Sequence, residues 1–278
     1  MKNVLFATTA LIATAGIASA DVKVGGYGFM GVIFDGSTST TSVSHKMRLT
    51  FSGSVETDSG VSFTASSRMN ISNSAKDAAA NALERGKITM TSGGLTLTVG
   101  ATNGAMKSAA RIATFHGFDD GSLLYAAGGP GVDSNVSTQN DSGNNVLISY
   151  ASGDFTVRAS TDVNGNNQEV GASYSFNNMT ISAGADTASA WMLGVKYNGG
   201  NFNLGLGTNS NSDIVLTAGY DISDATSIGF GLDAASGGTI NAVGLQVAHD
   251  LGGATLTGAV GQVNGSDTVA SLGVQFSF

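Results

Sequence analysis

Four basic side chains in the first third of the chain have the types and spacing to bind or steer charged solutes. Each stands on the polar side of a segment in which polar and apolar residues alternate. A period of two is typical of a β-strand, in which every second residue faces the same way. The four bases should therefore project from one polar face of a sheet. They are Arg48, Arg68, Arg85 and Lys87.

The distances from these bases to the nearest turns indicate that they lie at similar heights. Arg48 lies ten residues before the turn predicted at 58–60, and Arg68 lies eight residues after it. Arg85 lies seven residues before the next turn, which begins at Ser92. With a rise of about 3.3 Å per residue and a strand tilt of about 40°, the group should lie roughly 20 Å above those turns. The sequence thus predicts one basic patch.

Metal, thiol and nucleotide chemistry find little support in the sequence. The chain has no cysteine, which excludes disulfides, thiolate metal sites and thiol nucleophiles. The letters Gly26-x-Gly28-x-x-Gly31 match a dinucleotide fingerprint in spelling alone, because they lie inside a predicted strand rather than at the start of a helix. We expect no cofactor, no metal site and no enzyme activity. The three histidines have no metal-ligand spacing: His45, His116 and His249.

Residues 1–20 are typical of a secretory signal peptide. Lys2 supplies a charged start, Val4–Ile17 is apolar, and Ala18-Ser19-Ala20 forms a small-residue cleavage site. The alternative, a retained membrane helix, is disfavoured because the apolar stretch is too short to span a bilayer. We expect the exported protein to comprise residues 21–278.

The composition favours β-structure. The chain has 40 glycines, one proline and only 12% charged residues, whereas disordered chains are usually richer in proline and charge. No apolar run after residue 20 approaches the roughly 18 residues of a membrane helix, so any membrane-spanning structure must consist of strands. The formal net charge of −8 argues against nucleic acid as a partner.

Tyrosines recur before tight turns in the second half of the chain, at Tyr150, Tyr174, Tyr197 and Tyr220. Their spacing of 23 or 24 residues accommodates two strands, one short turn and one loop, which is the hairpin repeat of an up-and-down barrel. A β-solenoid is one alternative, although the units share no consensus. A soluble β-sandwich is another. The aromatic residues gather at the ends of the strands beside the turns, as a membrane-interface girdle requires.

The alternating segments give sixteen predicted strands. An even number is expected of a bacterial single-chain barrel, and sixteen strands would enclose an aqueous channel. The predicted strands are 22–34, 43–57, 61–72, 84–92, 95–102, 145–151, 155–162, 168–176, 179–186, 190–197, 202–208, 213–221, 226–233, 240–249, 254–263 and 268–278.

One long segment, Asn103–Asn144, interrupts this pattern between the fifth and sixth predicted strands. It holds the only proline, Pro130, and it is rich in apolar residues such as Ile112 and Phe118. Long loops in compact folds are usually functional. A packed loop therefore fits these residues better than a disordered external loop.

The chain resembles the general porins of Gram-negative outer membranes, most closely their alphaproteobacterial branch. The resemblance covers the whole chain and rests on the signal peptide, the mature start Val22–Gly28, the long third loop and the terminal Gly273–Phe278. It implies an all-β fold, a transmembrane antiparallel β-barrel of about 16 strands. It also implies a homotrimer in which the third external loop folds into each lumen and narrows the channel.

The resemblance further implies a pore constriction. In such porins, acidic residues of the third loop face basic residues of the wall. Here Asp119 and Asp120 would face the patch of Arg48, Arg68, Arg85 and Lys87. The alternative is that the arginines only fill the lumen or pair with neighbouring acids such as Glu84. Because charges at a constriction set ion selectivity, the excess of acids beyond Arg111 predicts a weak preference for cations.

The function predicted from these features is passive diffusion of ions and small hydrophilic solutes through a water-filled channel in the outer membrane. The alternative is a barrel that does not conduct, either an adhesin or a barrel enzyme. Outer-membrane lipid and further copies of the chain are the expected partners. Small residues on the lipid side of the early strands, namely Gly53, Ala65 and Gly86, suit contact between copies, and Ser72–Leu83 could latch a neighbour.

Overall fold

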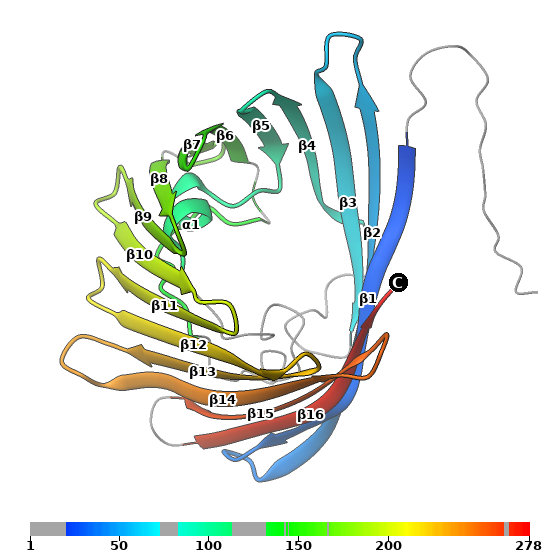
Figure 1. Cartoon of the computed structure of the whole chain (residues 1–278), viewed down its shortest axis with the longest axis vertical. Coiled ribbons are helices and arrows are strands. Elements are labelled where there is room, and N and C mark those ends of the chain that lie inside the picture. Colours follow the sequence, from blue (N-terminus) through cyan, green and yellow to red (C-terminus); the bar gives the residue numbers. More distant parts are fainter. Residues whose placement is uncertain are drawn as a thin grey trace, which may run out of the picture.

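The structure, a computed structural model, describes residues 21–72, 83–112, 132–141, 143, 145–165, 167–263 and 267–278. In these residues sixteen strands form one closed antiparallel barrel (Figure 1). Each strand pairs with the strands before and after it in the sequence, and β1 pairs with β16 to close the ring. The strands are β1 (Asp21–Asp35), β2 (Thr40–Glu56), β3 (Ser62–Ser72), β4 (Glu84–Ser92), β5 (Leu95–Gly100), β6 (Asn145–Ser152), β7 (Phe155–Asp162), β8 (Gln168–Phe176), β9 (Met179–Asp186), β10 (Trp191–Asn198), β11 (Phe202–Asn209), β12 (Ile214–Ser223), β13 (Thr226–Ala234), β14 (Ile240–Asp250), β15 (Thr255–Val263) and β16 (Asp267–Ser277).

Alternation along the strands gives the barrel two different faces. Outward positions such as Ile148 and Leu193 are large and apolar, and 43% and 47% of their surface is exposed. Inward positions such as Asn145 and Ser160 are polar and buried. A barrel with a lipid-facing wall and a polar interior has this alternation, because successive side chains of a strand point to opposite faces of the sheet.

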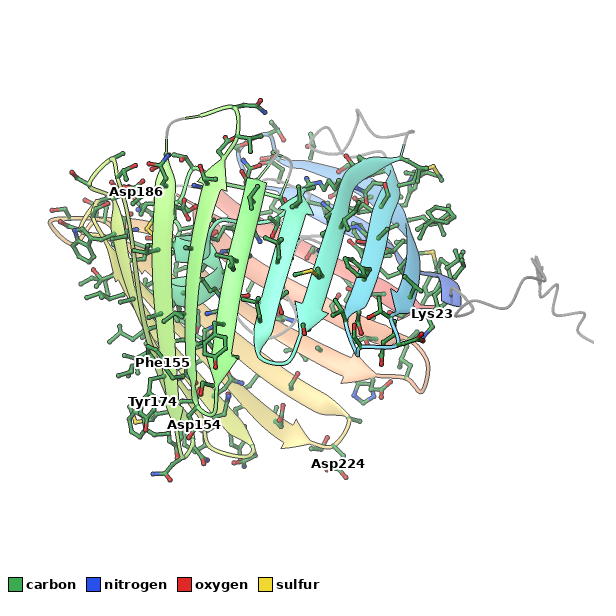
Figure 2. All side chains as sticks on the ribbon, turned by 90° about the horizontal axis from the view of Figure 1, so that it is seen from above. Lys23, Asp154, Phe155, Tyr174, Asp186 and Asp224 are labelled. Carbon is green, nitrogen blue, oxygen red and sulfur yellow. The ribbon has the colours of Figure 1, made fainter. Side chains whose placement is uncertain are left out.

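Aromatic side chains gather at the end of the barrel that carries the short turns. Figure 2 shows Phe155 and Tyr174 beside the turn of Asp154, at the opposite end from Asp186. The rings of Tyr197 and Phe202 flank the short turn between β10 and β11, with centroids 5.3 Å apart. These are the positions that an aromatic membrane-interface girdle would occupy.

The predicted strand count is confirmed, and the strand ends differ from the predictions by at most three residues. The fifth strand was predicted to reach residue 102 but ends at Gly100, whose φ is +111°. A Cβ at this position would lie 2.4 Å from the carbonyl oxygen of Gly86. Glycine is therefore required where the chain leaves the wall and enters the barrel.

The segment that follows β5 contains a short helix, α1 (Ala105–Ala110), which the sequence did not predict. It lies inside the ring against β8 and β9, with further contacts to β7 and β10 (Figure 1). The inward-folded third loop is thus confirmed. In the described part of the chain, helical segments fall short of the length and hydropathy that a membrane-spanning helix needs.

Candidate functional site

The structure brings the four predicted bases together around one cavity of about 280 Å³. Register explains the grouping, because Thr50 on β2 pairs with Arg68 on β3, and Ser66 on β3 pairs with Lys87 on β4. The cavity is lined by Arg48, Thr50, Ser66, Ser67, Arg68, Arg85, Lys87, Ala101, Thr102, Asn103 and Asp141. Three strands and both ends of the long loop therefore meet at this point, called the basic cavity below.

A break in the β3–β4 ladder shapes the basic cavity. The register shifts between Ser66 and Arg68, and Arg85 on the facing strand has a φ of +55°. In a regular strand, neighbours such as Glu84 and Arg85 would point to opposite faces. Here Glu84 Oε1 lies 4.0 Å from Arg85 Nε and 3.8 Å from Arg68 Nε. The irregularity thus lets one carboxylate face two guanidinium groups.

Asp141, near the C-terminal end of the loop, pairs with two of the bases. Its Oδ2 lies 3.4 Å from Arg68 Nη2, and its Oδ1 accepts a hydrogen bond from Arg85 Nη1. Partial burial alone would raise the pKa of Asp141, but Arg85 and, more weakly, Arg68 outweigh it and hold the pKa below its ordinary value of 3.8. The sequence analysis missed Asp141. Its signal was its place a few residues before β6, which joins the wall two strands from β4.

Arg48 is held by neutral partners instead. Its Nε donates a hydrogen bond of 2.8 Å to Asn70 Oδ1, and its guanidinium lies 5.0 Å from the centre of the Tyr27 ring. Asn70 in turn donates from its amide nitrogen to Glu84 Oε1. Side chains of β1, β2, β3 and β4 therefore form one connected network along this wall.

On the other side of the barrel, α1 rests on bare backbone. A Cβ at Gly171 on β8 would lie 2.5 Å from the carbonyl oxygen of Ala105, and one at Gly184 on β9 would lie 2.8 Å from Met106 Cα. A Cβ at Gly194 on β10 would lie 2.8 Å from the carbonyl oxygen of Ala110. These inward glycines leave the room that the helix fills. We call Gly171, Gly184 and Gly194 the glycine wall.

A buried carboxylate fixes the start of the helix. Glu169 on β8 is 1% exposed and accepts hydrogen bonds from Met106 N at 2.9 Å and from Ser137 Oγ at 2.5 Å. Ser160 Oγ on β7 accepts one from Ala105 N at 2.7 Å. The first N–H groups of a helix have no partner within it. The barrel wall supplies these partners, and through Ser137 the same carboxylate holds the returning part of the loop.

The two arms of the loop also clamp each other. Arg111 donates to both carboxylate oxygens of Asp133, at 2.8 and 2.6 Å. Ile112 N donates to Ser134 Oγ and Ser134 N donates to the carbonyl oxygen of Ile112, both at 2.8 Å. Asn209 on β11 donates to the carbonyl oxygen of Ser134 at 3.1 Å. Ile112 and Ser134, which lie on either side of residues 113–131, are therefore fixed to each other and to the wall.

An apolar cluster continues this attachment around the barrel. Ile112 and Val132, one from each arm of the loop, are 1% and 2% exposed. They belong to a buried cluster with inward side chains of β1, β12, β14 and β16: Phe29, Ile33, Val215, Ala242 and Val269. The interior of this barrel is therefore not polar throughout, which the sequence analysis did not foresee.

The predicted loop acids, Asp119 and Asp120, lie outside the described residues. Their placement opposite the bases remains a prediction, and so does the constriction role of all six residues. Most of the predicted latch Ser72–Leu83 and the predicted signal peptide 1–20 also lie outside the described residues.

Comparison with known proteins gives a consistent result. The family model described as Gram-negative porin matches residues 7–277. A mutant of the Rh. blastica porin is similar in structure, with a TM-score of 0.77 at 20% identity, covering 93% of this chain and 100% of that chain. A triple mutant of the Rhodopseudomonas blastica porin gives a TM-score of 0.76 with the same identity and coverage. No curated protein matches the sequence.

Proposed function

Because the chain belongs to the Gram-negative porin family, we propose that it forms a diffusion channel for ions and small hydrophilic solutes, narrowed by its third loop. The observation that carries this proposal is the loop fixed inside a closed sixteen-stranded barrel, beside the basic cavity. The family is not enzymatic, which argues against the barrel enzyme that the sequence analysis kept as an alternative.

Permeation through such a channel depends on what lines its narrowest part. The described bases of β2–β4 supply one charged side of the lumen, and Ile112 and Ser134, on either side of residues 113–131, lie at the wall of β10 and β11 across from it. We propose that Asp119 and Asp120 complete the constriction, so that a solute passes between acids and bases. Charge preference then follows from the field between them.

Planar-bilayer recording tests the channel. Purified protein should give stepwise openings, and replacing residues 113–131 by a short glycine-serine linker should raise the single-channel conductance. Arg111 and Ile112 are hydrogen-bonded to Asp133 and Ser134, so the two arms lie side by side and a short linker can join them. An unchanged conductance would contradict the constriction, and a folded barrel that never conducts would contradict the channel itself.

The resemblance to the alphaproteobacterial branch, the cleaved signal peptide and the final location in the outer membrane belong to the same proposal. The similar structures come from a porin of one such bacterium but share only 20% identity, which supports the fold alone. N-terminal sequencing of protein isolated from outer membranes should begin at Asp21. A sequence that begins at Met1 would contradict the cleavage.

We also propose a homotrimer whose subunits meet through the outer face of β1–β5. The small residues predicted to suit this contact, Gly53, Ala65 and Gly86, all line one apolar hollow of about 590 Å³. Phe51 and Ile88 stand at its sides. A neighbour could place bulky side chains in this hollow, which we call the subunit hollow. Cross-linking in mild detergent should yield trimers, and Ala65→Trp should reduce them. Monomers alone would contradict the assembly.

A further inference from the structure

The outer face of the barrel carries a second and larger hollow, on strands that the proposed subunit contact does not use. It has a volume of about 750 Å³ and lies over β7–β10. Its outward side chains are almost all apolar: Val157, Val170, Ala172, Ala183, Ala185, Trp191 and Leu193.

Cross-strand pairing explains its shape. Ala172 on β8 pairs with Ala183 on β9, and Ala185 on β9 pairs with Trp191 on β10. Three alanines thus form a low floor between larger side chains on β7, β8 and β10. The next outward residue of β9 is Ile181, which is 44% exposed and ends the run of alanines. The result is a groove along one half of β9.

The wall beneath this groove is thin, because its inward positions are also small. Gly171 and Gly184 of the glycine wall are among the residues that line the hollow from outside. On the inner side the same two glycines contact α1. The low floor outside and the seat of the helix inside therefore belong to one stretch of wall.

The groove lies in the half of the barrel that faces the cell exterior. Ala185 is the penultimate residue of β9 and Trp191 is the first residue of β10, both next to the turn that begins after Asp186. Figure 2 places Asp186 at the opposite rim from Asp154 and Tyr174, which mark the end with the short turns. In a barrel of this family the short turns are periplasmic. The groove is thus level with the external leaflet.

The rim above the groove offers no attraction to an anionic headgroup. The turns at 163–165, 167 and 187–190 contain no basic residue among those described. The acids at this rim order their own turns instead. Asp186 Oδ1 accepts hydrogen bonds from the N–H groups of Ala188 and Ala190, and Asp162 Oδ1 accepts one from Asn164 N. Recognition at this site must come from apolar shape.

We propose that the groove binds one acyl chain of a bilayer lipid in the external leaflet and holds it longer than the surrounding lipid is held. An occupant of this kind fits the apolar lining, the position in the leaflet and the lack of rim cations. A flexible hydrocarbon chain can also follow the alanine floor closely, and such close contact supplies dispersion energy that an unfilled hollow forfeits. A second copy of the chain is less suited, because the hollow with the predicted subunit residues lies on β1–β5.

The chain contains a single tryptophan, and it stands at this groove. Its fluorescence therefore reports on the site directly. The protein would be held in micelles of a short-chain nonionic detergent, to which phosphatidylcholine brominated on its acyl chains is added in increasing mole fractions. Because the groove then selects a long acyl chain over a chemically different host, the quenched fraction of Trp191 fluorescence at low bromolipid fractions should exceed the bulk mole fraction about twofold or more.

Ala183→Leu should fill the groove, and quenching should then follow the bulk mole fraction. Ala185→Leu is a second variant with the same expectation, should the first not fold. The matched control is Ala218→Leu, because Ala218 faces outward on β12, where it pairs with Leu204 and Phe230 away from the groove. This control should quench like the unaltered protein.

Two results would overturn the proposal. Quenching that follows the bulk mole fraction equally in the unaltered protein and in both groove variants would show ordinary lipid contact only. A tryptophan that stays unquenched at the highest bromolipid fraction would show that protein, such as a second copy, covers the groove. Neither result would bear on conduction, so the channel proposal is tested separately.

Discussion

The third loop meets two walls of the same barrel in opposite ways. At the basic cavity on β2–β4, Asp141 of the loop contacts Arg68 and Arg85 through charges that are 17% to 33% exposed. At the glycine wall on β8–β10, helix α1 lies directly on backbone, and the buried Glu169 carboxylate accepts a hydrogen bond from Met106 N in its first turn. One contact depends on charge, the other on shape and buried hydrogen bonds.

The two kinds of contact differ in what they contribute. Partly exposed ion pairs are typically worth about 0–1 kcal/mol and are weakened by salt. Overpacking a filled interface costs about 1–3 kcal/mol, and leaving a buried polar group without its partner costs a similar amount. The glycine wall should therefore determine where the loop lies, while the basic cavity determines the field that a solute meets.

The largest effect should come from side chains added to the glycine wall. Gly171→Ala with Gly184→Ala would place methyl groups 2.5 Å from the carbonyl oxygen of Ala105 and 2.8 Å from Met106 Cα. We expect the helix to leave its seat, stability to fall by about 1–3 kcal/mol, and conductance to change. Urea unfolding measures the loss of stability, and bilayer recording measures the change in conductance. Gly258→Ala on β15 is the control, because its methyl would meet Leu272 Cδ1 at an ordinary 3.6 Å.

A somewhat smaller effect should follow from removing the buried carboxylate. Glu169→Ala leaves Met106 N without its acceptor and leaves Ser137 Oγ only the carbonyl oxygen of Gln139 at 3.2 Å, which should cost about 1–3 kcal/mol of local stability. The chain has no cysteine, and Met106 is fully buried, so the thiol of Met106→Cys reports on the seating of the helix. Thiol reagents should label it slowly alone and much faster together with Glu169→Ala. Glu169→Gln keeps one acceptor and should stay closer to the slow rate. Equal labelling rates in the three proteins would show that Glu169 does not hold the helix in place.

These expectations also show how far the sequence leads. Period two determined the barrel, the sixteen strands and the common face of Arg48 and Lys87, because each depends on local alternation and on pairing between neighbours. Helix α1 was missed since it has only six residues, and its stability comes from glycines that are more than sixty residues away in the chain. The pairing of Asp141 was missed because its one signal, a place a few residues before β6, does not reveal the distant arginines of β3 and β4 that it contacts.

On the basic cavity, a change of charge should alter selectivity more than stability. Arg85→Gln removes a positive charge from the lumen and an ion-pair partner from Asp141 and Glu84. We expect the reversal potential in a salt gradient to shift toward cations, whatever the selectivity of the unaltered channel, with urea stability within about 1 kcal/mol of its original value. The weak cation preference predicted from the sequence is read from the same recordings. Lys23→Gln, at the exposed start of β1 and outside the basic cavity, is the control and should shift the potential less.

The smallest effect should be a pH dependence of the basic cavity that rests on Asp141. Its pKa lies below the ordinary 3.8, so its charge, and the attraction to Arg68 and Arg85, is fully present above that value. The attraction is lost only as the pH falls through the lowered pKa of the folded protein. Below the ordinary range, the neutralised acid should leave the arginines uncompensated and move the reversal potential toward anions. Asp141→Asn should show that shift already at neutral pH, and the part of the acid response that belongs to Asp141 should vanish. Because the Glu84 carboxylate lies beside the same arginines, the comparison must be made between the variant and the unaltered protein. An identical acid response in both would assign the effect to other carboxylates and leave the Asp141 contact without a role in the field.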